Sequence, residues 1–230
     1  MTEWRFLRGW STGELKVRMQ QLSGLQLNVE ALDEEMTGDR GWHHYHSESV
    51  IAREDADGAC FGRARTALHD YLFSDPTIVT AHFDPATLLL TRRFLLEVKV
   101  LGLRYLCPTL VNQVRDESNA CGFRYATLDG HIERGAEWFL LTRNPQGELR
   151  FRIEAWWMRG ELPNWWSHLG FIMVSGHYQR RWHREAHRRM SLLARCGSVM
   201  SAHPAGIFSR RDRNVTFTYH PYHKKRTPPR

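Results

Sequence analysis

The order of the expected elements limits the fold of this chain more than any other feature of its sequence. Seven segments have the composition and spacing of β-strands. In the last of them Phe151, Ile153, Ala155 and Trp157 face one way, and the residues between them face the other. This alternation is typical of an antiparallel sheet with one covered face. The predicted strands cover residues 42–51, 77–83, 92–100, 104–115, 121–128, 133–142 and 149–158.

A long helix is predicted after the last strand, over residues 176–195, with an apolar stripe along one face. The stripe consists of Tyr178, Trp182, Ala186, Met190 and Leu193, and the opposite side carries Arg181, Arg184, Arg188 and Arg195. Shorter helices are predicted near residues 14–22 and over 61–73, and a tryptophan-rich loop over 162–170. This order predicts an α+β fold, in which a curved antiparallel β-sheet is wrapped on a long C-terminal helix.

Charge is distributed unevenly along the 230 residues. The formal net charge is +7, yet residues 203–230 alone contain seven basic residues against the single acid Asp212. A segment rich in Pro, His and Arg is typical of a flexible tail. We therefore divide the chain into an N-terminal extension (1–40), a folded domain (41–197) and a basic, flexible tail (198–230).

The sequence contains no recognisable signal peptide and no membrane-spanning segment. Its N-terminus is too polar for a secretory signal. The most apolar later stretch, residues 165–174, is about half the roughly 20 residues that a spanning helix requires. These features predict a soluble, cytoplasmic protein. No phosphate-binding loop, dinucleotide fingerprint or G-x-S-x-G elbow occurs, so nothing supports a nucleotide-binding or hydrolase function.

Residues 127–139, T-L-D-G-H-I-E-R-G-A-E-W-F, place His131, Glu133 and Glu137 where a strand held only by packing would have apolar residues. Gly130 and Gly135 permit backbone bends or bulges that redirect such side chains. We interpret the segment as a polar site in the sheet, in a cavity beneath the long helix. The alternative is a buried structural hydrogen-bond network, because a buried carboxylate needs a partner in either case.

Two other clusters are weaker candidates for a site. His183 and His187 are four residues apart on the long helix, but the order H-R-E-A-H differs from the H-E-x-x-H zinc motif, and neighbouring arginines disfavour a cation. His44 and His46 share a strand face without a third ligand. We therefore predict no metal and no cofactor, and regard these histidines as solvated or packed.

The basic side chains of the helix and the tail suggest an anionic partner, either nucleic acid or a membrane. The alternative is a solvated helix face followed by a disordered terminus. The residues in question are Arg181, Arg184, Arg188, Arg210, Arg211, Arg213, Lys224, Lys225 and Arg226.

Several motifs together resemble domain-of-unknown-function family 1990, of the UPF0548 type. They are Gly41-Trp42, F-G-R-A-R-T-A-L at residues 61–68, F-R-Y-A-T-L-D-G-H-I-E-R-G-A-E-W-F at 123–139, and Arg159. The resemblance covers roughly residues 20–195. The chain departs from the family pattern at Ala136, where an acid is usual, and at Gly160. The family brings no assigned activity, but it is similar to the START and birch-pollen-allergen-like helix-grip proteins, which enclose a ligand cavity between sheet and helix.

The sequence therefore favours a helix-grip domain that binds a small hydrophobic or amphipathic ligand. Two alternatives stay open: an adaptor for nucleic acid or anionic membrane, and an enzyme that uses His131 and Glu137 as acid and base. The expected ligand-binding residues are Tyr125, Thr127, His131, Glu133, Glu137, Arg152, Glu154 and Arg159.

Overall fold

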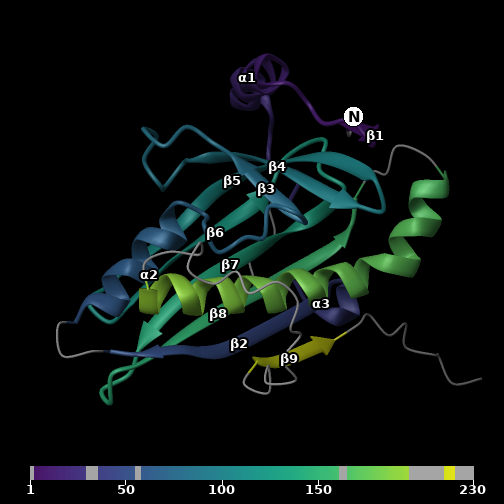
Figure 1. Cartoon of the computed structure of the whole chain (residues 1–230). Coiled ribbons are helices and arrows are strands. Elements are labelled where there is room, and N and C mark those ends of the chain that lie inside the picture. Colours follow the sequence, from purple (N-terminus) through teal and green to yellow (C-terminus); the bar gives the residue numbers. More distant parts are fainter. Residues whose placement is uncertain (1–2, 30–35, 55–57, 161–164, 197–214, 221–230) are drawn as a thin grey trace, which may run out of the picture.

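Figure 1 shows the fold of the chain in a computed structural model. The structure describes residues 3–29, 36–54, 58–160, 165–196 and 215–220. For residues 165–175 and 215–220 the description covers the backbone only.

The described strands form one nine-stranded sheet with the order β3-β4-β5-β6-β7-β8-β2-β9, and β1 pairs with β5 beside this path. Every pairing is antiparallel. The strands are β1 (Glu3–Phe6), β2 (His43–Arg53), β3 (Val79–His82), β4 (Arg93–Val100), β5 (Leu103–Asp116), β6 (Ala120–Thr127), β7 (Glu133–Arg143), β8 (Glu148–Arg159) and β9 (Val215–His220). The seven predicted strands are thereby confirmed to within a few residues at each end.

Helix α3 (Trp165–Cys196) lies across the concave face of the sheet, and α2 (Ala59–His69) lies beside it at one end (Figure 1). The predicted stripe is buried there: Trp182 and Leu193 are nearly inaccessible, and Ala186 and Met190 are fully so. They join a core that includes Phe73, Phe139 and Phe151. A curved antiparallel sheet around a long C-terminal helix is the predicted α+β, helix-grip fold.

Two helix boundaries differ from the prediction. Helix α3 begins at Trp165, so most of the expected tryptophan-rich loop is helical. Trp and Gly weaken a helix only modestly, and extending an existing helix needs no new nucleation. Helix α2 ends at His69 rather than near residue 73, because Tyr71 adopts the left-handed conformation with φ 56°.

The N-terminal segment packs on the outer face of the sheet. Helix α1 (Thr12–Gln21) begins with a capping box between Ser11 and Glu14 and is followed by a short 3-10 turn, η1 (Leu22–Gly24). Leu22 there is buried against Leu95 of β4 and Leu106 of β5. A second 3-10 turn, η3 (Gly38–Arg40), precedes β2. The segment predicted as an extension thus shares a small apolar cluster with the outer face of the sheet.

Strand β9 pairs with β2 at the edge of the sheet, although a flexible tail is predicted for these residues from the sequence. The remainder of that tail, including its six basic residues named above, lies outside the described residues. Among the helices that the structure describes, none is long and apolar enough to cross a membrane.

Candidate functional site

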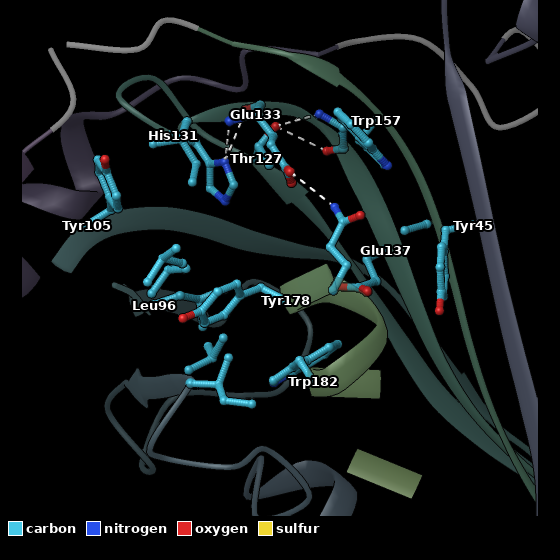
Figure 2. A pocket seen from close by; sticks show the side chains of 18 of the residues that line it. Tyr45, Leu96, Tyr105, Thr127, His131, Glu133, Glu137, Trp157, Tyr178 and Trp182 are labelled. Carbon is cyan, nitrogen blue, oxygen red and sulfur yellow. Dashed lines mark hydrogen bonds between the residues drawn. The ribbon is translucent and has the colours of Figure 1, made fainter. Parts of the chain in front are cut away.

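A cavity of about 210 Å³ lies between the concave face of the sheet and helix α3 (Figure 2). Most of its wall is apolar or aromatic, with contributions from several strands, helix α3 and the loops between them. Representative wall residues are Ile78, Leu96, Tyr105, Ile132, Trp157 and Trp182. Protein interiors are normally packed as densely as organic crystals, so an open volume of this size inside the fold is a candidate site.

Two glycines shape the segment that brings polar groups to this cavity. Gly130 turns the chain between β6 and β7 with φ 89°, which confirms the predicted bend. Gly135, by contrast, stays in regular register opposite Trp157 and forms no bulge. A Cβ atom there would lie 2.2 Å from the carbonyl oxygen of Trp156, so the close approach of β8 requires glycine. The backbone N–H of Gly135 donates to Thr127 Oγ1 at 2.8 Å.

His131 is 7% exposed and its ring points into the cavity (Figure 2). Its Nδ1 atom lies 2.9 Å from the backbone nitrogen of Glu133 and 3.1 Å from the carbonyl oxygen of the same residue. The shorter contact favours the tautomer in which Nδ1 accepts and Nε2 carries the proton. Burial lowers the pKa of His131 to about 4, so the ring is neutral near pH 7.

Glu137 lines the same cavity and accepts a short hydrogen bond from the hydroxyl of Tyr125. Burial raises the pKa of Glu137 to about 8, against the opposing effect of the Tyr125 hydroxyl, and nearby Glu133 raises it further. Burial also raises the pKa of Glu133, to about 7, and that carboxylate accepts only a long 3.4 Å bond from Gln179. Both acids can therefore hold or release a proton near neutral pH.

The loop after α2 contributes a residue that sequence reasoning missed. Tyr71 is 5% exposed, lines the cavity, and has its pKa raised by burial and by the nearby Glu137. Its hydroxyl lies near that of Tyr125 but outside normal hydrogen-bonding geometry with any described residue. No periodic pattern could have indicated Tyr71, because its left-handed backbone is imposed by the fold.

Buried serine and histidine side chains connect β2 with α3 behind the cavity. Ser47 Oγ lies 2.8 Å from His183 Nδ1 and 2.8 Å from His187 Nε2, and Ser49 Oγ lies 2.8 Å from His187 Nδ1. Burial lowers the pKa of both histidines, which therefore remain neutral. His183 and His187 of the H-R-E-A-H sequence are thus packed in the core, where they connect the helix to the sheet.

His183 also faces the cavity, with its Nε2 atom 3.9 Å from Glu137 Oε1. Among the described residues, no group of three His, Cys, Asp or Glu side chains is arranged to hold a metal ion.

Five of the eight expected site residues line the cavity together: Tyr125, Thr127, His131, Glu133 and Glu137. The other three do not. Glu154 pairs with His44 at 2.9 Å and with Arg152, on the outer face of β8. Arg159 is exposed at the end of β8. Side chains of a strand alternate between faces, so Arg152 and Glu154 point away from Ile153 and from the cavity.

The basic side chains of α3 lie away from the cavity. Arg181, Arg184 and Arg188 are exposed, and Arg188 forms an ion pair with Glu185 at 2.7 Å. Trp156 and Trp157 line the cavity, whereas the side chains of Trp165 and Trp166 lie outside the described ones.

A curved antiparallel sheet closed by one long helix over a cavity defines a helix-grip protein. The chain belongs to the family described as domain of unknown function DUF1990, whose model matches residues 28–189. It is 32% identical over 148 residues to a UPF0548 protein of Deinococcus radiodurans, a match that covers 60% of this chain and 73% of that relative. The resemblance noted from the motifs at residues 123–139 is confirmed.

Two solved structures are also similar. Ara h 8.0201 matches with 12% identity and a TM-score of 0.44, over 67% of this chain and 98% of that one. Human STARD10 matches with 10% identity and a TM-score of 0.42, over 82% of each chain.

Proposed function

We propose that this protein binds a small hydrophobic or amphipathic molecule in the cavity between the sheet and helix α3. The observation that carries the proposal is the cavity itself, about 210 Å³ of open volume with mostly apolar walls. Ligand sites in proteins typically combine such walls with a few convergent polar groups. A bound apolar molecule would leave water and gain van der Waals contacts with these walls.

The polar groups are gathered on one wall, which suits an amphipathic ligand. Tyr125, Thr127, His131, Glu133 and Glu137 would contact its head group, and the apolar wall would contain its body. The Thr127 hydroxyl also bonds to Asn28 and to the backbone of Gly135, so it holds the wall in place as well.

A cavity-filling substitution tests the proposal. Ala155 lies on the cavity wall, and Ala155→Phe would fill part of that volume. We expect the wild-type protein to enhance the fluorescence of the neutral apolar dye Nile red, and the variant to lose most of this enhancement. The matched control is Ala86→Phe in an exposed loop, which should bind the dye as the wild type does. Equal dye binding by all three proteins, or none by the wild type, would refute the proposal.

Acid–base catalysis in the same cavity is a second candidate. It is favoured by one observation: Glu137, next to the Tyr125 hydroxyl, has a pKa raised to about 8, close to the ideal for proton transfer at neutral pH. Binding of an anionic polymer or membrane has less support. The exposed arginines on α3 are consistent with a solvated face, and the basic residues of the tail lie outside the described part of the chain.

A further inference from the structure

The two carboxylates of the cavity lack a positively charged partner. Glu133 accepts one long bond from an uncharged amide, that of Gln179, and Glu137 accepts one from the hydroxyl of Tyr125. The basic atom near Glu137, Nε2 of His183, belongs to a ring that burial keeps neutral. Within the described residues, no charged Lys or Arg forms an ion pair with either acid.

Elsewhere this protein does supply cations to its buried acids. Glu97 is 6% exposed and lies 2.6 Å from Arg104 and 3.5 Å from Lys99. Its pKa is lowered to about 2, chiefly by hydrogen bonding to His82. Glu154 is buried beside Arg152 and His44, and its pKa is likewise lowered. The contrast indicates that Glu133 and Glu137 are not ordinary structural carboxylates, because a structural role requires compensation of the charge.

One more polar group at the cavity lacks a hydrogen bond of normal geometry within the described residues. It is the hydroxyl of Tyr71, a residue that is 5% exposed. Unpaired buried polar groups are rare in native proteins and indicate a missing partner.

The remaining wall is rich in aromatic rings. Tyr45, Tyr178, Trp157 and Trp182 line the volume from the sheet and the helix (Figure 2), and Tyr125 lines it as well. The negative faces of such rings attract ammonium groups, and the rest of each ring accommodates an apolar chain.

We infer that the ligand of this cavity is an amphipathic amine, whose protonated amino group lies between Glu133 and Glu137 and whose apolar body fills the aromatic volume. This inference rests on the proposed binding function and specifies the chemical class of its ligand. The ammonium group supplies the positive charge that Arg and Lys side chains provide to Glu97 and Glu154, and its N–H groups donate to the two carboxylates.

Other head groups fit these walls less well. A fatty acid would bring a third carboxylate next to two acids without a cation, which forces protonation or repulsion. A neutral alcohol could bond to one acid but brings no charge that would stabilise the ionised form of either acid. The affinity order expected for one alkyl chain is therefore amine, then alcohol, then carboxylate.

Displacement of Nile red by matched eight-carbon probes tests this order. We expect n-octylamine to displace the dye at concentrations about tenfold lower than n-octanol, the effect of a buried charge-assisted hydrogen bond, and octanoate to be weakest. In Glu137→Gln and Glu133→Gln the concentration of n-octylamine that displaces the dye should rise toward that of n-octanol. The concentration of n-octanol required should stay within about twofold of the wild-type value. The control Glu185→Gln, on the outer side of α3, should retain the full order.

The pH dependence gives a second readout. The groups that face Glu137 are Tyr45 on β2, Tyr125 on β6, Glu133 on β7, His183 on α3, and Tyr71 after α2. None of the five carries positive charge, and alkylamines stay protonated below about pH 10. Affinity for n-octylamine should therefore rise between pH 6 and 8 as the two acids ionise, and affinity for n-octanol should not.

The outcomes separate this inference from the proposed function. If Nile red binds, requires the Ala155 volume, and is displaced equally by amine and alcohol, the cavity is a ligand site but the amine inference is wrong. The amine inference is also wrong if Glu137→Gln leaves the affinity for n-octylamine unchanged. If no dye binds in the cavity at all, the proposed function fails first.

Discussion

At the scale of single residues, the protein treats its buried acids in two ways. Glu97 and Glu154 are paired with cations and have lowered pKa values, whereas Glu133 and Glu137 line a cavity and have raised ones. His131 in the same wall has a lowered pKa for the same reason, burial without compensation. The cavity thus contains groups whose protonation is coupled to folding.

This coupling predicts how stability depends on pH. The pKa of Glu137 is about 8 in the folded state, against 4.5 in the unfolded state, so its carboxyl group stays protonated to a higher pH when the protein is folded. Its contribution to stability is therefore greatest at low pH and is lost as pH rises toward 8. His131 acts oppositely, and its contribution is lost as pH falls from 6.5 to about 4. His183 and His187, whose pKa values are also lowered, act in the same direction as His131. Above about pH 7 the histidines are largely neutral in both states and the acids dominate, so the free energy of unfolding of the ligand-free protein should decrease with pH from there to pH 8.

Urea denaturation at several pH values measures this slope. Glu137→Gln should flatten it, because the glutamine keeps an acceptor for Tyr125 but does not titrate. Glu185→Gln on the outer side of α3 should leave the slope as in the wild type. A slope that is identical in the wild type and Glu137→Gln would show that Glu137 does not titrate in this range.

At the scale of elements, helix α3 is held to the sheet by two different kinds of contact. One is the apolar stripe, in which Trp182 packs among Phe73 and Phe139 and donates from Nε1 to Ser74 Oγ at 3.0 Å. The other is the polar bridge from Ser47 and Ser49 to its histidines. The stripe joins the main apolar core, and the bridge connects the helix to β2.

Trp182→Ala should therefore destabilise the protein by about 3–5 kcal/mol, as large-to-small changes of core aromatics do. The neighbouring change Arg181→Ala, on the exposed side of the same turn, should stay within about 0.5 kcal/mol. Thermal or chemical denaturation measures both. A loss below about 1 kcal/mol for Trp182→Ala would contradict the burial of the stripe.

At the scale of the whole molecule, the sheet is covered on both faces. Helices α2 and α3 cover the concave face, and the N-terminal segment covers part of the outer face through Leu22, Leu95 and Leu106 (Figure 1). Asn28 adds hydrogen bonds to the carbonyl oxygens of Leu128 and Glu133, close to the site. The N-terminal segment and the sheet should consequently unfold as one cooperative unit.

Substitutions in the N-terminal segment test whether it unfolds together with the sheet. Leu22 is 3% exposed, and Leu22→Ala should lower the unfolding free energy of the entire domain by about 2–5 kcal/mol. Val17 is 52% exposed on α1, and Val17→Ala should have an effect within about 0.5 kcal/mol. A separate, earlier transition in Leu22→Ala, with the main transition unchanged, would instead identify residues 1–40 as an independent appendage.

The sequence by itself determined the elements and the polar character of the site. Strand alternation and the helical stripe are local patterns, since each depends on neighbours two to four residues away. They located β2 to β8, the buried face of α3, and the trio His131, Glu133 and Glu137. The same alternation places Arg152 and Glu154 on the face of β8 opposite Ile153. The prediction that they belong to the site was therefore wrong, and the alternation of side chains along the strand was sufficient to exclude them.

Only the tertiary structure decided which distant groups meet. The contacts of Ser47 with His183 and His187 join residues more than 130 positions apart. Strand β9 likewise pairs with β2, which lies near the other end of the chain. Tyr71 reaches the cavity through a left-handed backbone conformation that the surrounding core stabilises. The absence of a cation beside Glu133 and Glu137 is likewise a property of the described fold, because compensation of a buried charge depends on every element that surrounds it.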